Sequence, residues 1–210
     1  MDVRIVEHPL VATRLTAMRD ETTDSANFRS ALHELTSLLV YEATRDIELS
    51  AYDIRTPVTS TSGYTLANPP LLVPVLRAGL GMAESAHNLL PEATMGFVGL
   101  ARDEATHEPR VYMESLPADL AGRHVIVLDP MVATGGSLVR CCEMIAARGC
   151  DNISVVCALA APPAIERLRN SGLPLTITTA SIDDGLNDDA FIVPGLGDAG
   201  DRQFGAYRRY

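Results

Sequence analysis

From residue 71 to residue 180 the sequence alternates between short apolar stretches and longer amphipathic ones, and this alternation restricts the fold more than any other feature. A buried strand of a parallel sheet is apolar almost throughout, whereas a covering helix is apolar on one side only. We therefore predict an α/β fold in which helices flank both faces of a parallel sheet. The expected strands are residues 71–76, 95–100, 124–128, 153–159 and 175–180, and the expected helices are residues 79–90, 137–148 and 163–171.

The pattern before this core is different. Apolar residues recur at three- and four-residue steps from Phe28, which predicts a long amphipathic helix that ends near Arg45. Asp24 or Ser25 is suited to cap the N-terminus of this helix. The two stretches with strand character that follow it are residues 47–52 and 58–65. We expect residues 1–70 to form an N-terminal arm of helix and hairpin.

Two long segments stand outside the alternation. Residues 101–117 are polar, and residues 181–205 are rich in glycine and aspartate. Loops longer than ~12–15 residues are uncommon in a compact domain unless they have a function. We expect the first segment to be a hood over a site in the core and the second to be a recognition loop, followed by a tail at residues 206–210.

The charge of the chain limits its partners. It has 17 lysines and arginines against 27 aspartates and glutamates, a formal net charge of −10. Such a chain repels nucleic acid unless its basic residues gather on one face, and its longest basic run is Arg208-Arg209, so we expect no nucleic-acid partner. Apolar runs fall short of the ~18 residues of a membrane span, and the four cysteines lack metal-site spacing. We expect a cytoplasmic protein with reduced thiols. We also expect it to act on a small anion and to have no membrane partner.

A glycine-bearing loop joins the expected strand at residues 124–128 to the next helix. The loop consists of Asp129, Pro130, Met131, Val132, Ala133, Thr134, Gly135, Gly136 and Ser137. Asp129 could accept hydrogen bonds from two ribose hydroxyls, and the N–H groups and hydroxyls from Thr134 to Ser137 could hold a phosphate. An ordinary strand-to-helix turn capped by Ser137 is the alternative. Walker A, GxGxxG and GxSxG patterns are absent, which disfavours an ATPase, a dehydrogenase and a serine hydrolase.

Two arginines follow neighbouring strands of the predicted sheet. Arg77 comes directly after residues 71–76, and Arg102 comes shortly after residues 95–100. Because the carboxyl ends of parallel strands lie at the same edge, both guanidinium groups could bind a second phosphate group, such as a diphosphate. A structural salt bridge explains either arginine equally well when it is considered alone.

A third element is the loop at residues 191–201, which reads FIVPGLGDAGD. Its glycines and proline fix a tight path, along which main-chain N–H and C=O groups can point into a cleft. Such groups can read a planar, amide-like base. Taken alone, the pattern also fits a loop with only a structural role.

Together these segments resemble the uracil phosphoribosyltransferase family. The similar segments are residues 8–10, 41–44, 73–81 (VPVLRAGLG), 129–137 and 180–201, within a match from about residue 5 to residue 205. The resemblance implies the type I phosphoribosyltransferase fold. It also implies transfer of the 5-phosphoribosyl group from phosphoribosyl diphosphate (PRPP) to N1 of uracil, with magnesium, giving UMP and diphosphate.

The resemblance assigns roles by position. Arg77 and Arg102 would hold the diphosphate, with Arg102 stabilising the transition state, and residues 129–137 would hold the ribose and its 5-phosphate. Magnesium would be held mainly by PRPP and not by a dedicated protein cage. Pro130 stands where many phosphoribosyltransferases have a second acid. The residues expected to hold uracil are Ile192, Gly197, Asp198 and Ala199.

Asp198 has a further implied role, because its side chain would face PRPP. It could assist loss of the N1 proton or orient a metal-bound water. Two alternatives to the uracil enzyme are a PRPP-binding regulator with the same fold and a phosphoribosyltransferase for another base. We also expect a homodimer or higher homo-oligomer, and the resemblance raises GTP as an effector.

Overall fold

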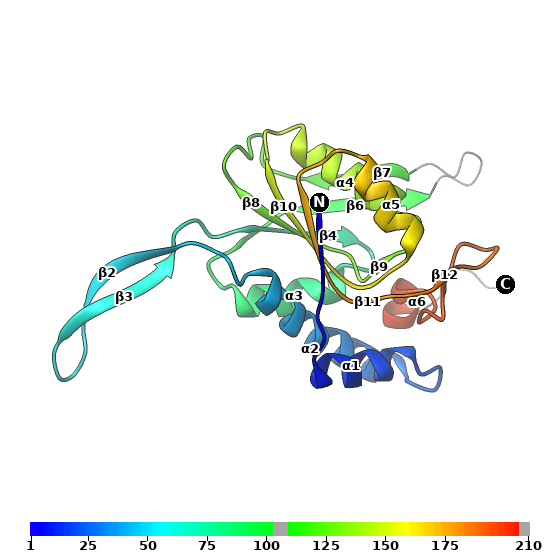
Figure 1. Ribbon diagram of the computed structural model, residues 1–210, viewed down its shortest axis with the longest axis horizontal. Helices are drawn as coiled ribbons and strands as arrows, with labels where there is room; N and C mark the ends of the chain where they lie inside the picture. Colours follow the sequence, from blue (N-terminus) through cyan, green and yellow to red (C-terminus); the bar gives the residue numbers. More distant parts are fainter. Residues whose placement is uncertain (103–108, 206–210) are drawn as a thin grey trace.

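The computed structural model describes residues 1–102 and 109–205, without the side chain of Arg102. Its centre is a sheet with the strand order β1-β11-β10-β8-β4-β6-β7, in which β5 also pairs with β4 and β9 with β10 (Figure 1). The strands are β1 (Asp2–Ile5), β4 (Leu71–Leu76), β5 (Thr94–Met95), β6 (Phe97–Arg102), β7 (Pro109–Ser115), β8 (His124–Leu128), β9 (Met131–Val132), β10 (Asn152–Ala160) and β11 (Leu175–Ile182). These pairings are parallel, except that β7 runs antiparallel to β6.

Helices cover both faces of this sheet, as the alternating sequence predicts. The helices are α1 (Pro9–Arg19), α2 (Ser25–Ala43), α3 (Leu80–Leu89), α4 (Gly136–Ala146), α5 (Pro162–Asn170) and α6 (Ala199–Phe204). In β8, Ile126 and Leu128 belong to the hydrophobic cluster shared with α1, α2 and α3, whereas Val125 and Val127 belong to the cluster shared with α4 and α5. Burial on both faces explains why the central strands are apolar throughout.

The long helix α2 was predicted, and Asp24 is its N-cap: the Asp24 carboxylate accepts a hydrogen bond of 2.8 Å from the N–H of Asn27. Sequence reasoning missed α1 and the four-residue strand β1 before it. The signal for α1 is present, because the His8 side chain caps the N–H of Leu10 and Pro9 takes the first helical position.

The predicted hairpin is formed by β2 (Leu49–Arg55) and β3 (Ser60–Leu66), which pair antiparallel. It extends far from the rest of the molecule (Figure 1). Its apolar side chains therefore contact little of their own chain. The large exposed apolar residues on the hairpin are Leu49, Tyr52, Ile54, Val58 and Tyr64.

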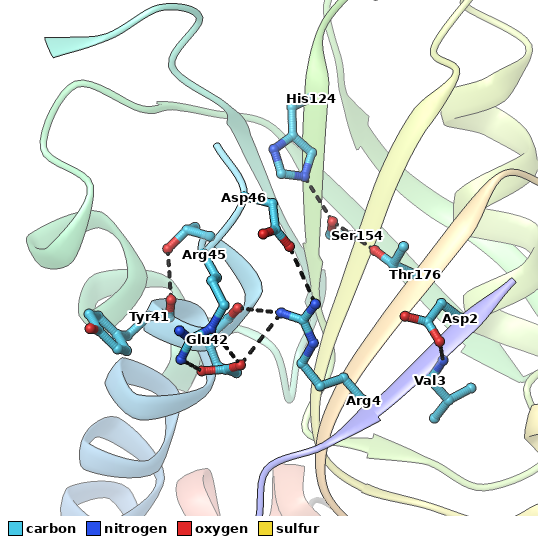
Figure 2. A network of polar contacts seen from close by, with 11 residues as sticks. Asp2, Val3, Arg4, Tyr41, Glu42, Arg45, Asp46, His124, Ser154 and Thr176 are labelled. Atoms are coloured by element: carbon cyan, nitrogen blue, oxygen red, sulfur yellow. Dashed lines mark hydrogen bonds and ion pairs between the residues drawn. The ribbon is translucent and has the colours of Figure 1, made fainter. Parts of the chain in front are cut away.

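A polar network lies at the amino ends of the strands, around the first strand of the chain (Figure 2). Arg4 of β1 donates hydrogen bonds to the main-chain oxygen of Glu42 at 3.0 Å and to the carboxylate of Asp46 at 3.3 Å. In the same view, His124 pairs with Ser154 at 2.8 Å. The network fixes β1 against the end of α2.

Throughout the described ranges, no helix is both long enough and apolar enough to cross a membrane.

Candidate functional site

Three loops meet at the carboxyl ends of β4 and β8 and enclose a pocket of about 360 Å³. The first loop contributes Ala78, and the second contributes Asp129, Met131 and Ala133. The third is the loop predicted to recognise a base. It contributes Asp189, Ala190, Phe191, Ile192, Gly197, Asp198, Ala199 and Gly200. The fold therefore brings together segments that are more than a hundred residues apart in the sequence.

Asp129 lines this pocket and comes directly after β8. Its carboxylate accepts one long hydrogen bond, 3.4 Å from the N–H of Met131. Burial raises the pKa of Asp129 from 3.8 to about 7, and the hydrogen bond from Met131 lowers it by a smaller amount. Because the protein gives this carboxylate one long hydrogen bond, its oxygens are well suited to accept hydrogen bonds from ribose hydroxyls.

The loop after Asp129 is fixed by its backbone. The main-chain oxygen of Pro130 accepts from the N–H groups of Ala158 and Leu159 at 3.0 and 3.1 Å, and the short strand β9 pairs with β10. Gly135 has a φ of 76°, a left-handed conformation that favours glycine, and α4 begins at the next residue.

Gly135, and not Ser137, is the N-cap residue of α4, and it has no side chain to cap the helix. The alternative in which Ser137 serves as an ordinary N-cap is therefore wrong. The first N–H groups of α4 have no partners within the helix, and the helix dipole favours an anion at this end. The local geometry suits a phosphate.

The loop after β4 passes unusually close to β8. A methyl group at Gly79 would lie 2.3 Å from the main-chain oxygen of Leu128 and 2.7 Å from the backbone of Val75, so only glycine fits. Arg77 in this loop forms an ion pair with Asp201 at 3.2 Å. Its backbone places it at the carboxyl edge of the sheet, where Arg102 ends β6; the side chain of Arg102 is outside the described part of the structure.

The predicted recognition loop contains more regular structure than its sequence suggests. Two short strands, β12 (Gly185–Leu186) and β13 (Ile192–Val193), pair antiparallel, and α6 follows them. Sequence reasoning missed α6. Its signal is Asp198 with Asp201 three residues later, since Asp198 is the N-cap and accepts a 2.8 Å hydrogen bond from the Asp201 N–H.

Apart from Arg102, the predicted residues divide into two groups. Those that line the pocket are Asp129, Met131, Ala133, Ile192, Gly197, Asp198 and Ala199. The others, Arg77, Pro130, Val132, Thr134, Gly135, Gly136 and Ser137, lie in the adjoining loops. Pro130 and Val132 are buried in the interior and do not line the pocket. Within residues 1–102 and 109–205, no three or more His, Cys, Asp or Glu side chains gather as a metal site.

The strand order of the sheet, with three loops that line one pocket at its carboxyl edge, defines the type I phosphoribosyltransferase fold. A hypoxanthine-guanine phosphoribosyltransferase from Bacillus anthracis is similar in fold, with a TM-score of 0.52 over 76% of this chain and 80% of that one, at 14% identity. At that identity the likeness concerns the fold alone.

A model of the uracil phosphoribosyltransferase family matches residues 5–206, and the chain belongs to this family. It is 53% identical to uracil phosphoribosyltransferase from Corynebacterium diphtheriae, over 98% of this chain and 97% of the relative. The AQ2163 protein from Aquifex aeolicus has a similar structure, with a TM-score of 0.91 and 36% identity over 97% of this chain and 98% of that one.

Proposed function

We propose that this chain transfers the 5-phosphoribosyl group of PRPP to N1 of uracil, forming UMP and diphosphate in pyrimidine salvage. Membership of the uracil phosphoribosyltransferase family supports this function. The structural observation that supports it is one pocket that is lined by Asp129, by Ile192 and by the turn at Gly197–Ala199. A site that holds a ribose beside a planar base is what the reaction requires.

The reaction needs no protein nucleophile. As diphosphate leaves C1 of the ribose, positive charge develops on the sugar and negative charge on the leaving group. Arg77 and Arg102 follow adjacent strands, β4 and β6, and we assign both to the diphosphate, where guanidinium groups stabilise the developing charge. Magnesium, bound mainly to PRPP oxygens, would add to this stabilisation.

The ribose and its 5-phosphate are assigned to the loop from Asp129 to Ser137. Asp129 accepts from the ribose hydroxyls, and the N-terminal N–H groups of α4 donate to the phosphate. Since Asp129 has a pKa of about 7, binding of hydroxyl donors and a nearby cation favours its ionised form. The binding of PRPP is therefore expected to release a proton near neutral pH.

Uracil is assigned to the main chain of Gly197, Asp198 and Ala199, with Ile192 against the ring. One carboxylate oxygen of Asp198 is occupied as the cap of α6, which leaves the other for a water or for the proton at N1. A backbone site discriminates by hydrogen-bond pattern, so cytosine, which carries an amino group in place of an oxygen, should be rejected.

The protein is also proposed to work as a homo-oligomer in the cytoplasm, with GTP as an effector implied by the family resemblance. The feature that supports an oligomer is the projecting hairpin, whose exposed tyrosines Tyr52 and Tyr64 are 53% and 66% accessible. Exposed aromatic side chains on an extended arm are typical of a surface that another chain covers.

Substitution of Arg102 tests the assignment of the diphosphate. Loss of a charge-assisted hydrogen bond is worth roughly 1.5–3 kcal/mol, so Arg102→Ala should reduce kcat/KM for PRPP about 10- to 100-fold. Thermal unfolding should be unchanged, because the expected partner of Arg102 is the substrate. Steady-state kinetics equal to those of the wild type would remove Arg102 from the site.

A further inference from the structure

We propose that Arg19 and Asp183 are positioning residues for the base: their ion pair holds the turn that precedes the uracil-binding main chain. Neither residue lines the pocket. The inference rests on the proposed function, because it assigns the pair a role in binding uracil and not in binding PRPP.

The ion pair is two-pronged and reaches the turn directly. Arg19, the last residue of α1, donates from Nη1 and Nη2 to the two carboxylate oxygens of Asp183, at 2.7 and 2.6 Å. Nη1 also donates to the main-chain oxygen of Gly195 at 2.8 Å. Asp183 in turn accepts from the N–H of Gly195 at 2.9 Å. Both polar groups of the Gly195 backbone are thus held by one pair of side chains.

The position of Gly195 makes this contact important for the pocket. Gly195 has a φ of 63°, and a methyl group there would lie 2.0 Å from the main-chain oxygen of Ile192, so the turn folds tightly back on itself. Ile192 comes before the turn and Gly197 after it, and both line the pocket. A shift of the turn would therefore move the two ends of the base site relative to each other.

A second arginine holds the following residue against the same N-terminal region. Arg202 of α6 donates to the main-chain oxygen of Leu196 at 3.1 Å and to that of Asp20 at 2.7 Å. Its guanidinium group lies over the ring of Phe28, 4.6 Å from the centroid. Arg19 and Arg202 thus fix neighbouring residues of the loop, and the end of α1 supplies the fixed support.

The Arg19–Asp183 contact is largely buried. The Asp183 side chain is 2% accessible and that of Arg19 is 26% accessible. Although burial raises the pKa of Asp183, hydrogen bonds from Arg19, Ser181 and Gly195 together hold it below the ordinary value, so the carboxylate stays ionised. Removal of one partner of a buried pair also destabilises the fold, and the test must separate that effect from positioning.

Arg19→Lys separates them, because lysine keeps the positive charge beside Asp183 but lacks the planar fork that spans Asp183 and Gly195 together. We expect the KM for uracil to rise about tenfold while the KM for PRPP stays within about twofold. Arg19→Ala should raise the uracil KM further than Arg19→Lys. A purely structural role would lower the melting temperature and leave the ratio of the two KM values unchanged.

Arg14→Lys is the matched control, since Arg14 lies on the same helix and pairs with Glu34 on the surface at 2.5 Å. It should change neither KM. If Arg19→Lys does not fold, Asp183→Asn serves in its place, because asparagine has the same shape and can still accept from the N–H of Gly195.

Equal changes in both KM values, no change in either, or unfolding of both variants would overturn the positioning role. The proposed function fails in a different way, through a wild-type protein that makes no UMP from uracil and PRPP. Calorimetric binding of UMP to the wild type and to Arg19→Lys gives a second readout that does not depend on turnover.

Discussion

Asp129, the residue proposed to bind the ribose, lies in an environment that disfavours its charge. Its pKa of about 7 in the folded protein lies above the 3.8 of the free side chain. The folded state therefore binds the proton more tightly than the unfolded state does. Ionisation of Asp129 destabilises the fold, fully above pH 7 and progressively less as the pH falls from 7 to about 4. A group that lowers stability in this way is common at functional sites.

Asp129→Asn should therefore stabilise the protein and impair its activity together. The melting temperature should exceed that of the wild type at pH 8, by roughly 2–4 °C for each kcal/mol regained, and the gain should shrink at pH 5. The KM for PRPP should rise at least about tenfold, because charge-assisted hydrogen bonds to the ribose are lost. Differential scanning calorimetry at the two pH values and steady-state kinetics measure both effects.

The exposed Asp151, in the turn before β10, provides a control for the charge change. Asp151→Asn should leave the melting temperature and the PRPP kinetics close to those of the wild type at both pH values. A melting temperature of Asp129→Asn below that of the wild type at pH 8 would show that the carboxylate is not destabilising.

At the scale of elements, the site depends on how closely the loop after β4 approaches the end of β8. Gly79 permits this approach, because no side chain fits between the two backbones. The same loop is held from the other side, where the Gln203 side chain of α6 donates to the main-chain oxygen of Ala78 at 3.0 Å. The loop after β4, the end of β8 and α6 are thus packed as one unit.

Gly79→Ala should disturb this unit, since the new methyl group would meet backbone atoms that cannot rotate away. We expect destabilisation of about 1–3 kcal/mol and a raised KM for PRPP. Gly185→Ala is the control, because a methyl group at Gly185 has no atom within 4 Å. Chemical denaturation and PRPP kinetics of the two variants make the comparison, and equal stability of the two would contradict the packing argument.

At the scale of the whole molecule, the sheet and the helices that cover it form one compact body. The β2–β3 hairpin projects from this body (Figure 1). A two-stranded hairpin is only marginally stable in water by itself. The exposed apolar residues of this hairpin suggest that a second copy of the chain covers it.

Tyr52→Ser combined with Tyr64→Ser should weaken the oligomer at least about tenfold, because two large aromatic contacts are removed. Sedimentation velocity over a range of concentrations would detect the change in mass. Tyr41→Ser, which removes an exposed tyrosine from α2 and not from the hairpin, is the control. An unchanged mass for the double variant would exclude the hairpin from the interface.

The sequence predicts the features of this molecule that depend on local pattern. The core strands, α2 with its cap Asp24 and the position of the glycine-bearing loop at residues 129–137 all follow from periodicity or from residues close together in the chain. β7 was not predicted, since its exposed face made residues 101–117 resemble a polar loop. The short elements β1 and α6 contain too few residues for a periodic pattern, whereas α1 has an N-terminal signal, His8 followed by Pro9, that sequence reasoning overlooked.

Contacts between distant residues are a different matter. Arg19 and Asp183 are 164 residues apart, and nothing in either neighbourhood indicates that they meet. Their approach results from the packing of α1 and α2 against the sheet, which brings the end of α1 to the predicted recognition loop. The residues expected to touch substrate could thus be predicted from local motifs, whereas those that position them required the folded structure.

The most direct test of the central claim is release of diphosphate from PRPP in the presence of magnesium, measured with uracil, cytosine, hypoxanthine and no base, with the nucleotide product identified. We predict release with uracil alone and UMP as the product. Measurable binding of PRPP without release for any base would contradict the enzyme and indicate a PRPP-binding regulator, and release with another base would contradict the assigned specificity.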